Sequence, residues 1–132
     1  MGDGLILETT FLIDLERERR RQDPGPAHRF LAARPEERLW LAIPTVGELA
    51  AGTADAERGA WESLIGPFGI FDVDLDVCWA YGRTYRYLAD NGMLIGTNDL
   101  WIAAIALTQQ LPLVSRNARE FRRVPGLRVL GY

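Results

Sequence analysis

Lysine is absent from the 132 residues, and cysteine and histidine occur only once each, as Cys78 and His28. Without lysine the chain has no residue for the lysine of a P-loop or for a Schiff base. One cysteine and one histidine also cannot build a disulfide or a zinc site of the Cys/His type within the chain. A metal held by this chain alone therefore needs oxygen ligands. We expect His28 at the surface and Cys78 as a small side chain in the core.

Long apolar runs are missing as well. No run approaches the roughly eighteen residues that a membrane span requires, and residues 1–4 lack the basic start of a signal peptide. We therefore expect a cytoplasmic protein that does not enter a membrane. A hydrophobic content of 48% and a charged content of 25% are typical of a globular chain, and the length suits a single domain over residues 1–132.

The charged residues include only one basic type. The formal net charge of −3 argues against a protein that binds nucleic acid through a broad basic surface. All fifteen basic residues are arginines, and several of them concentrate in residues 17–21 and 116–123. Arginine suits forked contacts with phosphate or carboxylate groups, although codon or lineage bias is the favoured explanation of the missing lysine.

Segments typical of strands alternate with segments typical of helices. Residues 39–43 are apolar throughout, as expected of a strand covered on both faces. Apolar residues recur at helical spacing between Val77 and Leu88, and residues 54–65 also favour a helix. This alternation predicts an α/β fold, a three-layer αβα sandwich with a parallel five-stranded sheet. The expected strands are 5–7, 39–43, 70–73, 113–115 and 127–130.

Polar side chains with oxygen ligands follow the predicted strands. Glu8 ends the first strand, Glu48 lies about a helical turn after the second, and Asp99 begins the buried helix before the fourth strand, which Asn117 follows. In an open parallel sheet, ligands bind beyond the carboxyl ends of the strands. Three carboxylates and an amide at that edge predict a site for Mg²⁺ or Mn²⁺.

Each of these residues also has a structural interpretation. Residues 45–48 fit a capping box, residues 117–120 fit a looser one, Asp99 suits the start of a helix, and Glu8 suits an N-cap. Capping does not require the acids to gather at one edge of the sheet. Their common location therefore favours the metal site over four separate caps.

Four segments, in order, resemble the PIN domain of VapC-type toxins. They are LILETTFLIDL (5–15), IPTVGELAAG (43–52), GTNDLWIAA (96–104) and LVSRN through Phe121 (113–121). The resemblance covers essentially the whole chain. It implies a metal-dependent endoribonuclease that cleaves RNA with a metal-activated water, forms a homodimer, and is the toxin of a toxin–antitoxin pair restrained by a VapB-like antitoxin.

The resemblance assigns the family acids to Glu8, Glu48 and Asp99, with a fourth, variable position at Asn117. Family members usually have Asp where this chain has Glu8, and some have Asp at the neutral Asn117. Glu120, one turn further on, is an alternative source of the missing charge. These departures leave open a second hypothesis, a catalytically weak or silent PIN-like module that binds a partner protein or RNA. A nucleotide- or flavin-binding domain is disfavoured because no glycine-rich turn follows the first strand.

Side chains around the acids have candidate roles in holding the ligands or the RNA. Arg116, at the expected rim, either holds a phosphate oxygen or is solvated. The residues expected to hydrogen-bond the acids, or otherwise to cap helices, are Thr9, Thr97 and Ser115. The aromatic residues that either stack on RNA bases or pack in the core or a dimer are Tyr85, Tyr87 and Trp101.

A surplus of carboxylates also suits an arginine from a partner protein. We predict that the antitoxin binds across the carboxyl edge of the sheet and against the first helix. There Phe11, Leu12 and Leu15 precede the arginine-rich residues 17–21. Part of this apolar stripe must pack on the sheet, so only a flank is free for a partner or for the second subunit.

Overall fold

The fold is built on a parallel sheet, described here from a computed structural model of residues 3–132. The strands are β1 (Leu5–Leu7), β2 (Leu39–Ala42), β3 (Gly69–Phe71), β4 (Leu113–Val114) and β5 (Val129–Leu130). They lie in the order β3-β2-β1-β4-β5, and every neighbouring pair is parallel. The register pairs Ile6 of β1 with Trp40 on one side and with Leu113 on the other. This confirms the predicted α/β fold and its five-stranded sheet.

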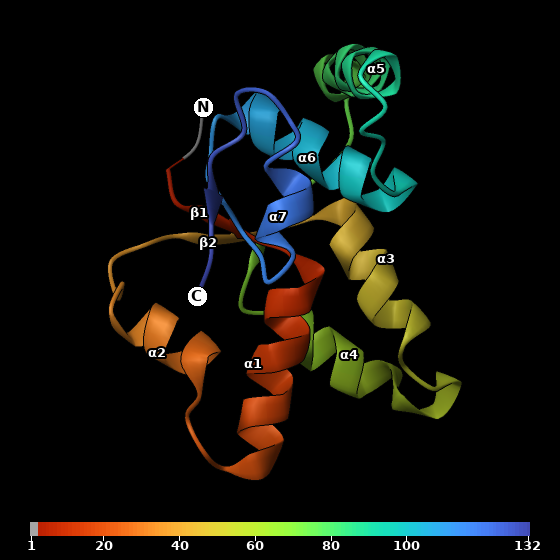
Figure 1. Cartoon of the computed structure of the whole chain (residues 1–132). Coiled ribbons are helices and arrows are strands. Elements are labelled where there is room, and N and C mark those ends of the chain that lie inside the picture. The colour runs from red at the N-terminus through yellow and green to blue at the C-terminus, as the bar shows by residue number, and fades with distance from the viewer. Residues whose placement is uncertain (1–2) are drawn as a thin grey trace.

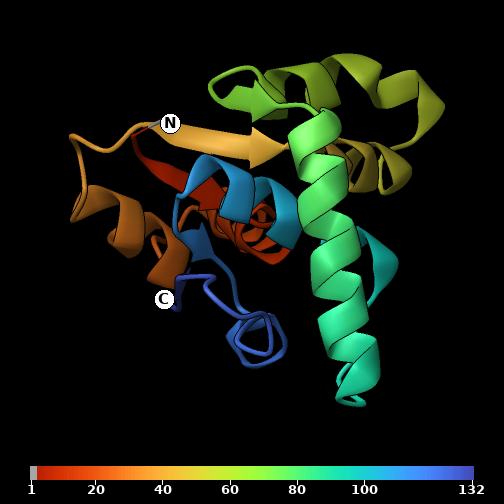
Figure 2. The ribbon, with the colours of Figure 1, turned by 90° about the horizontal axis from the view of Figure 1, so that it is seen from above.

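Helices cover both faces of the sheet. They are α1 (Thr9–Arg21), α2 (Pro26–Ala32), α3 (Ile43–Ala51), the 3-10 turn η1 (Asp55–Glu57), α4 (Arg58–Ile65), α5 (Leu75–Asp90), α6 (Thr97–Gln109) and α7 (Ala118–Phe121). In Figure 1, α5 and α6 lie on one side of the sheet and α1, α2 and α4 on the other. The view from above in Figure 2 shows α5 lying across α6. Over residues 3–132, no helix is long and apolar enough to cross a membrane.

The central strand β1 supplies both halves of the core. Its side chains alternate between the two faces, as the period of a strand requires. Leu5 and Leu7 pack with the cluster under α1, α2 and α3, whereas Ile6 packs with the cluster under α5 and α6. All three side chains are buried. Because β1 is enclosed on both faces, the residue that follows it is held firmly in place.

Several predicted boundaries differ from the structure. The strands predicted over 39–43, 113–115 and 127–130 are shorter: β2 ends at Ala42, β4 ends at Val114 and β5 begins at Val129. The segment 54–65 is not one helix, because η1 precedes α4 and the two are assigned separately. The third strand ends at Phe71 rather than at residue 73, and the Asp72 carboxylate there accepts a hydrogen bond of 2.7 Å from the backbone N–H of Val73. An aspartate that binds the neighbouring backbone favours a turn over a further strand residue.

The single cysteine was placed wrongly from sequence. Cys78 is exposed rather than buried, because the side of α5 that packs inward carries its neighbour Val77 together with Thr84 and Leu88. His28 was expected at the surface, and its side chain is 38% exposed. One ring nitrogen, Nδ1, nevertheless lies 2.7 Å from a carboxylate oxygen of Glu18.

Glu18 joins α1 to α2. It stands in the arginine-rich segment, but its side chain turns inward and is only 10% exposed. Its carboxylate accepts hydrogen bonds of 2.9 Å from the backbone N–H groups of Gly25, Ala27 and His28, which lie at the start of α2. Burial by itself raises the pKa of Glu18, but these hydrogen bonds outweigh burial and lower the pKa to about 2.

We predict that Glu18→Gln destabilises the fold by roughly 1.5–3 kcal/mol, because an amide cannot accept all of these bonds as a carboxylate does. Urea unfolding at pH 7 measures the loss. The carboxylate contributes fully above its unfolded pKa near 4.5 and loses this contribution as the pH falls towards 2. The stability difference between wild type and variant should therefore shrink across that range.

The matched control is Glu16→Gln, which removes a surface pairing with Arg19 and Arg20. Such pairs contribute roughly 0–1 kcal/mol. An equal loss in the two variants would mean that Glu18 does not anchor α2.

Candidate metal centre

The candidate site lies where the order of the sheet changes direction. From β1 the chain continues to β2 on one side, whereas β4 and β5 lie on the other side. Glu8 and Ser115 directly follow the neighbouring strands β1 and β4. The Ser115 hydroxyl donates to Glu8 Oε2 over 2.8 Å, so two residues 107 positions apart meet at this edge. Such a point is the usual ligand site of an open parallel sheet.

Glu8 is 2% exposed and is the N-cap of α1. Its Oε2 atom accepts from the Thr10 N–H at 3.0 Å and from the Thr10 hydroxyl at 2.5 Å, in addition to Ser115. Across residues 3–132 these bonds all reach Oε2 and none reaches Oε1. Capping and ligand binding therefore do not compete, because they use different oxygens of the same carboxylate.

The same two hydroxyls hold the loop between β4 and α7. Thr10 Oγ1 accepts from the Arg116 N–H at 3.0 Å, and Ser115 Oγ accepts from the Asn117 N–H at 2.9 Å. Each hydroxyl thus gives its proton to Glu8 and receives one from the loop backbone. The position of the loop is fixed by the same carboxylate that is predicted to bind metal.

Glu48 is held by a second chain of hydroxyls. The Thr9 hydroxyl donates to Glu48 Oε1 over 2.7 Å and lies 3.1 Å from the Thr45 hydroxyl, which is fully buried. The capping-box alternative for residues 45–48 is wrong, because α3 already begins at Ile43 and Thr45 lies inside it. Thr9 therefore supports Glu48, whereas Thr10 and Ser115 support Glu8.

Asp99 lies in the first turn of α6 and is close enough to the other acids to feel their charge. Burial is the largest effect on its carboxyl group, and the negative charges of Glu8, Glu48 and Glu120 add to it, so the pKa of Asp99 rises to about 6. In residues 3–132, no arginine or histidine forms an ion pair with any of these four acids. The site is thus a cluster of negative charge without a protein counter-charge.

Only some of the other predicted residues contact the acids or affect their charge. Asn117 is exposed, and its contact with the cluster is made by its backbone N–H rather than by its side chain. Thr97 is exposed and, within the described chain, donates to none of the acids. Glu120 is also exposed, yet its charge reaches Asp99. Trp101 stacks on Tyr81 with ring centroids 3.9 Å apart, so this ring is engaged in packing.

The residues present fit a hard divalent cation. The side chains that meet here offer carboxylate oxygens, the ligands that Mg²⁺ and Mn²⁺ prefer. In residues 3–132, no three acidic, histidine or cysteine side chains are arranged so that they could hold a metal ion by themselves. A magnesium site that takes water and substrate phosphate as ligands needs fewer protein ligands.

Comparison with known proteins identifies the family of this chain. The family model of the PIN domain matches residues 5–127. Ribonuclease VapC1 from Haemophilus influenzae (strain R2866) is 32% identical over 127 residues, which cover 92% of each chain. The chain belongs to the VapC-type ribonuclease toxins of the PIN-domain family. A more distant member, Ribonuclease VapC1 from Methanocaldococcus jannaschii, is 26% identical over 91% of this chain and 80% of its own.

Solved structures of VapBC proteins share the fold. A chain of VapBC2 from Rickettsia felis, bound to a DNA fragment from their promoter, superposes with a TM-score of 0.85 at 22% identity and covers 97% of this chain and 98% of its own. A chain of DNA-bound VapBC from Salmonella typhimurium gives 0.84 at 25% identity, with 97% of both chains covered. The predicted PIN-like architecture is therefore confirmed.

Two residues of this VapC-type site escaped prediction. Thr10 holds Glu8 and the loop, and Thr45 lies against Thr9. A hydroxyl two positions after an N-cap is a local signal that points to Thr10. Thr45 gives no such signal, because its partner is 36 residues away.

We predict that Asp99→Asn stabilises the metal-free protein at pH 7. Because the folded pKa of Asp99 lies above its unfolded value near 3.8, the folded state loses stability as the pH rises towards 6. The amide that replaces the carboxylate carries no charge, so this loss of stability disappears in the variant. Solvent screening and the lost interaction with the start of α6 reduce the effect, and we expect the free energy of unfolding to rise by on the order of 1 kcal/mol. Thermal unfolding with a chelator between pH 4 and 8 measures it.

Asp23→Asn, which changes an exposed carboxylate between α1 and α2, is the control. It should leave the pH dependence of the melting temperature as in wild type. If the melting temperatures of Asp99→Asn and wild type depend on pH in the same way, the neighbouring carboxylates do not destabilise the ionised form of Asp99.

Proposed function

We propose that this VapC-type toxin cleaves RNA phosphodiester bonds with Mg²⁺ or Mn²⁺ held by Glu8, Glu48 and Asp99. The observation that carries the proposal is the effect of these acids on one another near the switch point of the sheet: the charges of Glu8 and Glu48 raise the pKa of Asp99, and in residues 3–132 no arginine or histidine forms an ion pair with any of the three. Bound there, a divalent ion supplies an activated water and stabilises charge on the leaving oxygen. Asn117 is the fourth polar position of this proposal, and Glu120, whose charge reaches Asp99, is the alternative.

In the proposed reaction, hydrogen bonds within the protein fix the carboxylates that would bind the metal. Thr10 and Ser115 fix one oxygen of Glu8, and Thr9 fixes one oxygen of Glu48. In residues 3–132 the second oxygen of each carboxylate accepts no hydrogen bond, so it is available to a cation. Ligands fixed in this way lose little freedom when an ion binds, because their side chains are already ordered.

Replacement of the acids tests the proposal. With a panel of single-stranded RNAs and millimolar Mg²⁺ or Mn²⁺, Asp99→Asn and Glu8→Ala should each reduce cleavage at least about 100-fold, because a charged ligand is lost. Glu8→Asp keeps the charge on a shorter arm and should lose activity only moderately. The same ions should raise the melting temperature of wild type but not that of Asp99→Asn.

Two results would contradict this proposal. Unchanged activity in Glu8→Ala would leave Glu8 only its role as the N-cap of α1. RNA binding by wild type without any metal-dependent cleavage would favour the alternative of a silent PIN-like binding module.

A groove beside α1 suits the predicted antitoxin. Phe11 and Leu12 are fully buried, so the free flank of this stripe is Leu15. Leu15 lines a cavity of about 710 Å³ between α1, α2 and α4. Its apolar lining is Leu15, Leu31, Trp61, Leu64 and Phe68, and its rim includes Glu16, Arg19, Arg20, His28 and Glu57. An apolar floor with a charged rim fits an amphipathic helix.

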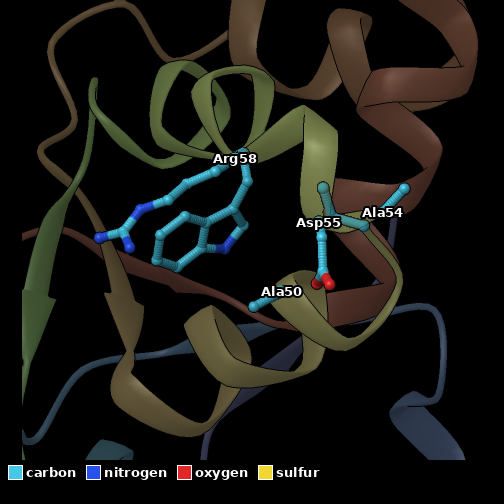
Figure 3. A pocket seen from close by; sticks show the side chains of 6 residues that line it. Ala50, Ala54, Asp55 and Arg58 are labelled. Atoms are coloured by element: carbon cyan, nitrogen blue, oxygen red, sulfur yellow. The ribbon is translucent and has the colours of Figure 1, made fainter.

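A smaller neighbouring pocket of about 430 Å³ lies between α3 and α4, and its lining is shown in Figure 3. Arg58 and Asp55 both line it, but Arg58 pairs with Glu62 over 3.3 Å instead. Trp61 lines both cavities and donates to the Val46 carbonyl over 3.1 Å. These cavities contain none of the three predicted metal ligands. We infer that the antitoxin occupies the larger groove and reaches the acids with an arginine.

The Glu48→Gln/Asp99→Asn double variant tests that arginine. Titration of the cognate antitoxin should show binding weaker by roughly 2 kcal/mol or more, about 30-fold, because two charged acceptors are lost. The Glu36→Gln/Glu37→Gln double variant removes the same charge from exposed positions and should bind as wild type does. Equal affinity in all three proteins would place the arginine elsewhere.

Exposed apolar side chains between β3 and α5 support the proposed homodimer. Leu75 is 88% exposed and Trp79 67%, and Ile70 and Val73 just before α5 are exposed as well, as are Tyr85 and Tyr87 further along the helix. Large apolar side chains gathered on a surface mark contact sites between proteins. This surface is separate from the antitoxin groove, since the two share no residue.

A further inference from the structure

Arg116 is held by a carboxylate that does not belong to the candidate metal centre. Its Nη1 atom donates to Asp14 Oδ1 over 2.7 Å, and the Tyr132 hydroxyl donates to Asp14 Oδ2 over 2.5 Å. Asp14, on α1, is therefore bonded at both oxygens and is only 17% exposed. The three residues come from distant parts of the sequence, so the arrangement depends on the complete fold.

Tyr132 is held in place by aromatic packing. Its ring packs edge-on against Phe11, with centroids 4.8 Å apart, and against Phe30 at 6.4 Å. Burial and the bond to Asp14 raise the pKa of Tyr132, so its hydroxyl stays protonated and keeps donating. The core under α1 and α2 thus fixes the direction of the Asp14 carboxylate.

The backbone of Arg116 is fixed at the opposite end. Its N–H donates to Thr10 Oγ1 over 3.0 Å, and that hydroxyl donates to Glu8. Arg116 is therefore anchored two hydrogen bonds away from a predicted metal ligand. Both ends of the residue are restrained, while its side chain remains 51% exposed.

The charge at this position is positive. Arg17 Nη1 lies 3.9 Å from the same Asp14 oxygen, so two guanidinium groups share one carboxylate and leave a net charge of about +1. An exposed, restrained arginine beside a cluster of acids suits a phosphate group, because its free N–H groups form charge-assisted bonds with phosphate oxygens. An RNA strand entering the site carries such groups along its whole length.

We propose that Arg116 binds a phosphate of the RNA strand beside the bond that is cut, and that Asp14 and Tyr132 are positioning residues that hold its guanidinium. The inference rests on the proposed ribonuclease function and adds the group that orients the strand. It assigns roles to two residues, Asp14 and Tyr132, that lie outside the metal centre.

Salt dependence of RNA binding tests the role of Arg116. We would measure the binding of a labelled single-stranded RNA to Asp99→Asn protein, which should not cut it, at several salt concentrations. Adding Arg116→Ala should reduce the slope of log K against log salt by about 0.7, the value for one phosphate contact on a single strand. The control is Arg58→Ala, whose arginine forms an exposed pair with Glu62 on α4 and should leave the slope unchanged.

Cleavage kinetics in the active protein test the positioning residues. Tyr132→Phe keeps the ring and the charge and removes only the hydroxyl, so KM should rise about threefold while kcat and the melting temperature stay near wild type. Asp14→Asn removes a negative charge. If only net charge mattered, this variant would bind RNA more tightly, whereas the loss of positioning predicts a higher KM.

The outcomes separate the inference from the function on which it rests. A wild-type protein that cuts no RNA with any metal refutes the ribonuclease proposal itself. If wild type cuts RNA but Arg116→Ala matches Arg58→Ala in slope and KM, Arg116 holds no phosphate. Weaker antitoxin binding with unchanged RNA binding would assign Arg116 to the antitoxin and overturn the inference.

Discussion

The arrangement of this protein depends on the burial of Glu8 at the exit of the central strand. A carboxylate that is 2% exposed must be hydrogen-bonded, because water cannot solvate it. The donors are Thr10 and Ser115, which belong to α1 and to the end of β4. Satisfying one oxygen therefore joins the first helix to the fourth strand and fixes the loop that carries Arg116. The other oxygen is left for a ligand, so the bonds that stabilise the fold also shape the site.

The acids around Glu8 create a conflict between stability and function. Asp99 lies in the first turn of α6, whose following residues, from Leu100 to Ala106, lie mostly in the core, so its position is fixed by packing. The start of a helix favours negative charge, but burial and the neighbouring carboxylates oppose ionisation more strongly, as the raised pKa of Asp99 shows. A divalent cation would relieve this repulsion, and so would an arginine from a partner. Under the proposed function, metal and antitoxin would therefore compete for the same negative charge, which gives inhibition a physical basis.

Local patterns in the sequence predicted most of the fold and the acidic positions. Strands and helices were recognisable because their apolar periods lie within short segments, and acids that directly follow strands must share one edge of a parallel sheet. The contacts that hold those acids were less accessible. Thr45 and Thr9 are 36 residues apart, and Tyr132 and Asp14 are 118 apart, so no local pattern connects them. Cys78 was misplaced because its residue type suggests burial, whereas its position on α5 decides exposure. Residue type alone cannot show which side of a helix faces inward.

Three acids spaced along α1 and its N-cap show how the helix organises the molecule. Glu8 binds the loop after β4, Asp14 binds Arg116 and Tyr132, and Glu18 binds the start of α2. Glu18 accepts at both oxygens and so does Asp14, which explains why these two acids serve structure or positioning. Glu8 differs because its bonds reach only one oxygen, within the described residues. A buried carboxylate with one unshared oxygen, beside other acids, is the group on this helix that gains most from a cation. The role that we propose for α1 therefore lies at its N-cap, Glu8, and the contacts of the rest of the helix keep that residue in place.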